Sequence, residues 1–307
     1  MDDPAFTAPG RFWKGNLHTH SDRSDGALPP EEVCRRYREA GYDFIALTDH
    51  FVGLYGFPIT DTRPFRTNAF TTLPGAEVHS GAMANGELWH ILAVGLPDGF
   101  EPPAVPGFAP GEGQESGPAL AARARLAGAF VAVVHPEWSG LSLPDALALE
   151  SAHAVEVYNH GCAVGADRPH GFWHLDRMLE RGRELTLIAT DDAHFTEPDH
   201  FGGWTMVRAE ANEPEALLDA LKAGRHYAST GPEIHALAWE RGKVIVQHSP
   251  ASAVIASGAG SAAAVRHHAV PATLTVLELG RVARSPWRRL TVVGPDGRRA
   301  WSNPVRI

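Results

Sequence analysis

Residues 12–20 read FWKGNLHTH, and residues 42–50 read YDFIALTDH. In both stretches an apolar run ends in histidine, a pattern typical of a buried strand with polar side chains at its end. Five similar runs follow, at residues 70–80, 88–96, 130–136, 154–160 and 185–194, and helical patterns lie between many of them, at 29–40, 119–128, 144–149, 171–182 and 213–224. This alternation predicts an α/β fold with a parallel sheet, and about seven repeats of it favour an irregular barrel.

The pattern changes near residue 230. Short alternating apolar runs follow, at residues 234–240, 243–248, 253–257, 272–278 and 289–294, with turns between them. We therefore predict two domains, a barrel over residues 1–232 and a small β-rich domain over residues 233–307. Residues 97–118 are rich in proline, glycine and glutamate, which predicts a surface loop.

Composition narrows the class of protein. A net charge of −9 argues against binding duplex nucleic acid, but it allows a small anionic substrate, because bound metal ions can dominate the local field. The two cysteines, Cys34 and Cys162, form no CxxC pair, which favours a reducing compartment. No apolar run reaches the roughly 18 residues of a membrane span. We expect a cytoplasmic protein away from membranes, and its oligomeric state is not predicted.

Histidine is abundant, with 17 residues, and several histidines stand with carboxylates where apolar runs end. The carboxyl ends of barrel strands meet on one face, so these side chains are expected to share a pocket. The candidates are His18, His20, Asp25, His50, Glu77, His90, His135, Asp192 and His194. Imidazole and carboxylate ligands suit Zn, Mn or Fe, and a carboxylate between two ions can bridge them around a shared hydroxide.

In their order, these positions resemble the PHP (polymerase and histidinol phosphatase) family. The resemblance spans residues 13–232 and rests on His18-x-His20, Ser24-Asp25-Gly26, Thr48-Asp49-His50, Glu77, His90, His135 and Asp192-x-His194. It implies a distorted (β/α)7 TIM-like barrel with two or three divalent metal ions. One ion would be held by His18, His20, Glu77 and Asp192, a second by Glu77, His90 and His135, and a third by Asp25, His50 and His194.

Two further stretches, residues 216–231 and 299–304, resemble the carbaryl-hydrolase-like branch (CehA/McbA) of that family. Aspartate at position 25, where many PHP proteins carry histidine, resembles a subgroup that includes this branch. The resemblance implies that the substrate need not be a phosphate.

Other polar residues are candidates for substrate contact. His79 shares a strand face with Glu77, Asn159 and His160 end the sixth run, and Arg63 and Arg66 follow the second. Each has an ordinary alternative, as a packed residue, a strand-to-loop transition or a solvated loop charge.

The primary hypothesis is a phosphoesterase that acts on a small phosphate ester through a metal-bridging hydroxide, with Glu77 at the metals and Asp25 or His194 delivering a proton to the leaving oxygen. The alternatives are a metal-dependent hydrolase of carbamates, esters or amides and a catalytically silent metal-binding regulatory module.

Overall fold

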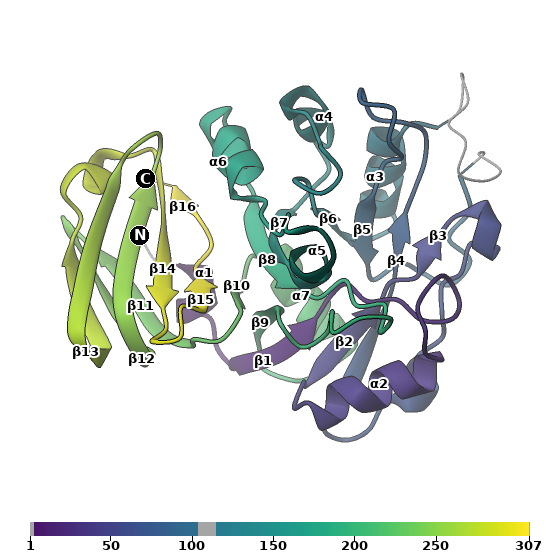
Figure 1. The fold of residues 1–307 in the computed structure, drawn as a ribbon, viewed down its shortest axis with the longest axis horizontal. Coiled ribbons are helices and arrows are strands. Elements are labelled where there is room, and N and C mark those ends of the chain that lie inside the picture. Colours follow the sequence, from purple (N-terminus) through teal and green to yellow (C-terminus); the bar gives the residue numbers. More distant parts are fainter. Residues whose placement is uncertain (1–2, 104–114, 307) are drawn as a thin grey trace.

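The computed structural model describes residues 3–103 and 115–306, which form a mixed sheet flanked by helices (Figure 1). All seven predicted strands are present, as β1 (Arg11–Asn16), β2 (Phe44–Leu47), β4 (Thr71–Val78), β5 (Ile91–Val94), β6 (Phe130–Val133), β7 (Ala154–Asn159) and β8 (Thr186–Thr190). Every residue of β2, β5 and β6 is buried, as expected for strands covered on both faces. Part of the predicted loop, residues 104–114, lies outside the described residues.

The prediction that all these strands run parallel is wrong at β5. This strand is antiparallel to both β4 and β6, whereas the pairs β1–β2, β2–β4, β6–β7 and β7–β8 are parallel. The chain between β4 and β5 forms a loop closed by an antiparallel bridge between Ala82 and Leu88, so it reverses direction without a crossover helix. Between β8 and the end of β1, the described pairing is one bridge, from Thr19 to Ala193, so closure of a barrel stays a prediction.

The five predicted helices are present, as α2 (Pro30–Glu39), α3 (Gly117–Leu126), α4 (Leu143–Ala148), α6 (Phe172–Glu180) and α7 (Pro214–Lys222). The helix α5 (His160–Ala166) was not predicted, because two of its seven residues are glycine. It begins where Asn159 Oδ1 accepts a hydrogen bond from the Cys162 amide, 2.8 Å away. Short elements complete this part, namely α1 (Pro4–Thr7), β3 (His50–Phe51), η1 (Gly53–Tyr55) and η2 (Arg63–Phe65). No helix in the described ranges is both long and apolar enough to cross a bilayer.

Two strands that were not predicted, β9 (Trp204–Ala209) and β10 (His226–Ser229), extend the sheet antiparallel beside β1. Beyond them lie β11 (Ile234–Glu240), β12 (Lys243–Gly258), β13 (Ala263–Glu278), η3 (Gly280–Arg284), β14 (Trp287–Val293), β15 (Arg299–Trp301) and β16 (Val305–Arg306). The predicted runs at 243–248 and 253–257 form one strand, β12, because register shifts around Ala251 bend the strand without ending it.

The sheet continues across the predicted domain boundary at residue 232. Strand β10 pairs with β15, and β15 pairs with β14. Asn303 Oδ1 accepts from the Leu187 amide at the start of β8 (2.9 Å), and Asn303 Nδ2 donates to the Gly224 and His226 carbonyls. Because the two regions share a sheet and these buried contacts, their division into two domains stays a prediction.

Candidate metal centre

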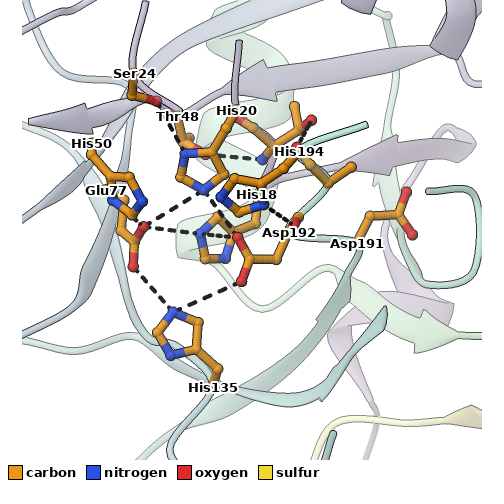
Figure 2. Close-up of polar contacts among 12 residues, drawn as sticks. His18, His20, Ser24, Thr48, His50, Glu77, His135, Asp191, Asp192 and His194 are labelled. Carbon is orange, nitrogen blue, oxygen red and sulfur yellow. Dashed lines mark hydrogen bonds and ion pairs between the residues drawn. The ribbon is translucent and has the colours of Figure 1, made fainter. Parts of the chain in front are cut away.

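The nine predicted ligands converge at one edge of the sheet. Figure 2 shows His18, His20, His50, Glu77, His135, Asp192 and His194 gathered there. His18, His20 and Asp25 follow β1, His50 lies in β3, Glu77 lies in β4, His90 precedes β5, His135 follows β6, and Asp192 and His194 follow β8. His90 reaches this edge because β5 runs antiparallel to its neighbours, which places the beginning of β5 beside the ends of the other strands.

Glu77 lies at the centre, with its side chain only 1% exposed. Its Oε1 atom lies 2.6 Å from Nδ1 of His90 and 3.1 Å from Nε2 of His135. Its Oε2 atom lies 2.8 Å from Nδ1 of His50 and 3.5 Å from Nε2 of His18. The two oxygens of one buried carboxylate therefore face different histidines, which is the arrangement that a bridging ligand needs.

Asp192 lies beside the two histidines that follow β1. Its Oδ1 atom lies 2.9 Å from Nε2 of His20 and 3.2 Å from Nε2 of His18. Its neighbour Asp191 points away from the cluster (Figure 2) and accepts hydrogen bonds from the backbone amides of residues 201–203, so it holds that loop.

A more open group lies beside this buried pair. Asp25 Oδ2 lies 3.3 Å from His50 Nε2, and Asp25 Oδ1 lies 3.4 Å from His194 Nε2. The Asp25 side chain is 39% exposed and that of His194 is 26% exposed, so these two carry the most exposed side chains of the nine. His20 Nδ1 also approaches Asp25 Oδ1, at 3.8 Å.

Four sets of side chains bring their donor atoms within 4.8 Å of one another. They are His20–Asp25–His50–His194, His50–Glu77–His79–His90, His18–Glu77–His135 and His18–His20–Asp192. Every predicted ligand belongs to at least one set. The sets differ from the predicted grouping in their membership. His20 joins the Asp25 set, and both His50 and His79 join the set around Glu77 and His90. His135 is grouped with His18 and Glu77 instead of with His90, and Glu77 is not in the set of His18, His20 and Asp192.

The donor atoms fit divalent cations. His18 Nε2 and Glu77 Oε2 are buried, have no hydrogen-bond partner and lie 3.5 Å apart. Buried polar atoms rarely remain unsatisfied, and a cation near both would satisfy them. Imidazole nitrogen and carboxylate oxygen are ligands of Zn, Mn and Fe.

Charge alternates through the cluster. Burial raises the pKa of Glu77, but the charges of His50 and His90 lower it by more than burial raises it. The pKa of Glu77 is therefore well below its ordinary value. Burial and the neighbouring His194 and His50 lower the pKa of His20 to about 3, which leaves a neutral imidazole able to ligate. Burial also lowers the pKa of His50, but Glu77 and Asp25 outweigh it and raise the value to about 10.

The backbone is strained at two predicted ligands. His135 has a φ of 26° and Asp192 a φ of 55°, values that non-glycine residues rarely adopt. Each is held by a hydrogen bond from its own amide, from His135 N to Glu156 Oε2 (2.6 Å) and from Asp192 N to the His18 carbonyl (2.8 Å). Strain of this kind concentrates at functional sites, where the surrounding structure maintains it.

Two of the candidate substrate residues, His79 and Asn159, contact the cluster, whereas the described contacts of His160 lie outside it. His79 Nε2 lies 2.8 Å from His50 Nδ1, and His79 Nδ1 lies 2.9 Å from the Trp89 carbonyl, so this ring is packed among the candidate ligands. Asn159 is buried, and its Nδ2 donates to Asp192 Oδ2 at 3.0 Å. His160 Nδ1 contacts the Tyr158 hydroxyl at 3.1 Å.

The two arginine candidates are engaged elsewhere. Arg63 pairs with Asp61 at 2.8 Å and with Asp98 at 3.4 Å, on the surface. Arg66 donates to the side chain and carbonyl of Thr72. Among the described hydrogen bonds and ion pairs, neither arginine contacts the cluster. Their role in substrate binding therefore stays a prediction.

Sequence reasoning missed three residues at the site. Glu156 in β7 is fully buried and contacts His18 and the His135 amide. Trp138 has its ring centroid 4.9 Å from that of His135 and 5.5 Å from that of His90. Arg168 lines a cavity that His90 also lines. The available signal was a charged residue inside the apolar run at 154–160, which marks Glu156 as a buried carboxylate in need of partners.

Two cavities open beside the cluster and share Trp138 in their walls. One, of about 380 Å³, is lined by His90, Glu87 and Arg168, and the other, of about 250 Å³, by Asp192, His194 and Glu197. A third cavity of about 400 Å³ lies where β8 begins and includes none of the candidate ligands.

Comparisons with known proteins found similarities in sequence and in fold. A model of the PHP domain family matches residues 16–80, the segment that carries His18, His20, Asp25, His50 and Glu77. No curated protein matches the chain. The fold is similar to that of a two-domain protein from Bacteroides vulgatus ATCC 8482 containing a predicted PHP-like metal-dependent phosphoesterase, with a TM-score of 0.53, 17% identity, and 98% of this chain and 97% of that chain covered.

Two more distant structures have TM-scores below 0.5. An amidohydrolase from Chromobacterium violaceum, with bound sulfate and no metal, has a TM-score of 0.43 and 17% identity, and a candidate metal-dependent phosphoesterase from Bifidobacterium adolescentis ATCC 15703 has a TM-score of 0.42 and 16% identity. In both comparisons 60% of this chain and 89% of the other are covered. None of the three structures bears on the predicted carbaryl-hydrolase-like branch, which stays a prediction.

Proposed function

We propose that the chain is a metal-dependent hydrolase that holds two or three divalent ions and cleaves a small phosphate ester. The observation that carries this proposal is the position of Glu77, whose two oxygens face separate histidines in a buried cluster. When bound, Zn, Mn or Fe ions would polarise the scissile bond and lower the pKa of a water molecule. The interpretation of β1–β8 as a distorted barrel, with its active site at this edge, belongs to the same proposal.

The chain's own residues divide their roles by burial. Glu77 and Asp192 are enclosed and orient the imidazoles of His18 and His20. Asp25 and His194 stand at the open side, where Asp25 Oδ1 can hold a proton on His194 Nε2. Burial lowers the pKa of His194, but the hydrogen bond to Asp25 and the charge of Asp192 raise it to about 9. This pair is therefore where a proton can be delivered to a leaving oxygen.

The two cavities beside Trp138 support a small substrate with its reacting group at the cluster and its remaining parts on either side. Arg168 lines the larger cavity, and its guanidinium has no hydrogen-bond or ion-pair partner among the described residues. A free guanidinium suits a phosphate or carboxylate oxygen. Cavities of these sizes suit a small molecule better than a duplex.

The test is turnover of p-nitrophenyl phosphate, its diester analogue and p-nitrophenyl acetate by protein of known metal content, reconstituted with Mn or Zn. Phosphate-ester cleavage that chelation abolishes, and that Asp192→Ala and His135→Ala remove while the fold stays intact, would support the proposal. Wild-type turnover in both variants would refute it. Stoichiometric metal binding without turnover on a broad ester panel would favour a regulatory module.

A second candidate is hydrolysis of a carbamate, ester or amide, which needs the same cluster and a polarised carbonyl. The observation that favours it is the charge of the cavities. Glu87 lines the Arg168 cavity and Glu197 the other, so a phosphate would meet acidic groups on both sides. Metal-dependent cleavage of p-nitrophenyl acetate alone would favour this candidate.

A further inference from the structure

Glu156 lies in the middle of β7, between Val155 and Val157, with no exposed surface. Neither the predicted ligand sets nor the proposed reaction gives it a role. A buried carboxylate is costly unless donors surround it, so its contacts indicate why this position is not apolar.

Four donors meet this carboxylate. Oε1 contacts Nδ1 of His18 at 3.2 Å and accepts from the Thr190 hydroxyl. Oε2 accepts from the His135 amide at 2.6 Å and from Nδ2 of Asn159 at 3.0 Å. The same Asn159 Nδ2 donates to Asp192 Oδ2 at 3.0 Å. Glu156 thus contacts two predicted ligands, His18 and His135, and reaches a third, Asp192, through one amide.

The contact with His18 determines which ring nitrogen faces the cluster. A carboxylate oxygen accepts, so the hydrogen of a neutral His18 ring lies on Nδ1 and the lone pair on Nε2. Nε2 lies 3.2 Å from Asp192 Oδ1 and 3.5 Å from Glu77 Oε2, and it makes no hydrogen bond. The unpartnered lone pair therefore points at the carboxylates that would share an ion with it.

We propose that Glu156 is a positioning residue for the metal centre, which fixes the tautomer of His18 and the backbone of His135 and, through Asn159, orients Asp192. This inference rests on the proposed metal cluster but not on the identity of the substrate. Carboxylates that accept from the second nitrogen of a ligating histidine fix its orientation and raise its basicity.

The substitution Glu156→Gln separates this role from simple packing, since its volume is nearly unchanged. Two N–H donors, from His135 and Asn159, meet at the Oε2 position, so the amide oxygen takes that place and the amide nitrogen takes the place of Oε1. That nitrogen then donates to His18 Nδ1, which forces the hydrogen onto Nε2 and removes the lone pair from the cluster. The matched control is Thr190→Val, which removes one donor to Oε1 and leaves the His18 contact in place.

Zinc affinity is measured by competition with a chelator, metal content by elemental analysis, and folding by the melting temperature of the metal-free proteins. We expect Glu156→Gln to bind zinc about 10- to 100-fold more weakly, whereas Thr190→Val should keep an affinity close to that of the wild type, because the Glu156 carboxylate still faces His18 Nδ1. Equal zinc affinity in a folded Glu156→Gln protein would overturn the positioning role alone. A wild-type protein that binds no metal would overturn both this inference and the proposed function.

A spectroscopic measurement on the wild type does not depend on the variant's folding. Long-range ¹⁵N–¹H correlation spectra of the zinc-loaded protein distinguish a protonated from a zinc-bound imidazole nitrogen. We expect His18 to show a hydrogen on Nδ1 and zinc on Nε2. The reverse assignment would overturn the proposal.

Discussion

His50 Nε2 lies 3.3 Å from Asp25 Oδ2, while the opposite nitrogen of the same ring, Nδ1, lies 2.8 Å from Glu77 Oε2. One imidazole thus connects the exposed carboxylate at the mouth with the buried carboxylate at the centre. The two carboxylates differ in burial, at 39% and 1% exposure, and in how many candidate ligand sets they join.

This difference predicts unequal metal losses. Asp25→Asn removes a carboxylate from one candidate set and should cost at most one ion per chain, whereas Glu77→Gln affects two sets and should cost two. Elemental analysis after dialysis measures both, with circular dichroism as the control for folding. If the two variants retain the same amount of metal, Glu77 does not bridge.

Arg168 should affect substrate affinity more than chemistry. In Arg168→Ala, loss of a charge-assisted contact of about 1.5 kcal/mol should raise KM roughly tenfold with kcat nearly unchanged. Arg63→Ala is the matched control, because Arg63 is already paired with Asp61 and Asp98. Steady-state kinetics on the best ester substrate decide the matter, and an equal effect of both substitutions would exclude a specific role for Arg168.

Buried His226 makes stability depend on pH. Burial lowers its pKa from 6.5 to about 3, so between these values the unfolded chain binds a proton that the folded chain does not. The contribution of His226 to the free energy of unfolding therefore falls as pH falls, by about 2 kcal/mol between pH 7 and pH 5. Urea unfolding of metal-free His226→Phe should show a correspondingly shallower loss over this range than wild type. As a control, substitution of the exposed His267 by Phe should leave the slope of unfolding free energy against pH as in the wild type. A wild-type slope in His226→Phe would contradict this assignment.

Gly171 should tolerate no side chain. A Cβ at this position would lie 2.1 Å from the Glu156 carbonyl oxygen, a backbone atom that cannot turn aside. Gly171→Ala should therefore cost about 1–3 kcal/mol in the free energy of unfolding, the usual range for overpacking. Gly165→Ala, in α5 with nothing within 4 Å, should be neutral or stabilising. Chemical denaturation of both variants compares them, and equal stabilities would contradict the close packing at Gly171.

The sequence predicted which segments form strands better than it predicted the directions of those strands. Apolar runs at strand length predicted all seven strands from β1 to β8, excluding the short β3, because their residues are buried. The reversal at β5 depends on the loop between β4 and β5, whose bridge from Ala82 to Leu88 has no apolar periodicity to reveal it. Strand β9 was missed because Thr205 and Arg208 interrupt its apolar pattern, although the backbone of residues 205–209 pairs with β1.

The site was predictable where a chemical type recurs at strand ends, and less so elsewhere. The nine predicted ligands meet because strand ends meet. Glu156 was missed because it lies within a strand, and its importance depends on Thr190, Asn159 and His135 in three other places of the chain. Arg63 and Arg66 were candidates for substrate binding because arginine suits a phosphate. Their partners depend on local loop geometry, which sequence spacing does not reveal.

The contact made by Asn303 can form only late in the synthesis of this chain. Asn303 holds the Leu187 amide, 116 positions earlier in the sequence, at the beginning of the strand that leads to Asp192 and His194. At about 5–20 residues per second, synthesis separates the two residues by roughly 6 to 23 seconds. During that interval β8 lacks a buried contact. Once β10 has been synthesised, it lacks its partner β15 until residues 299–301 follow, so the nascent chain carries an unpaired strand edge. A premature stop just before residue 303 would therefore spare every candidate ligand and still disturb the strand that carries two of them.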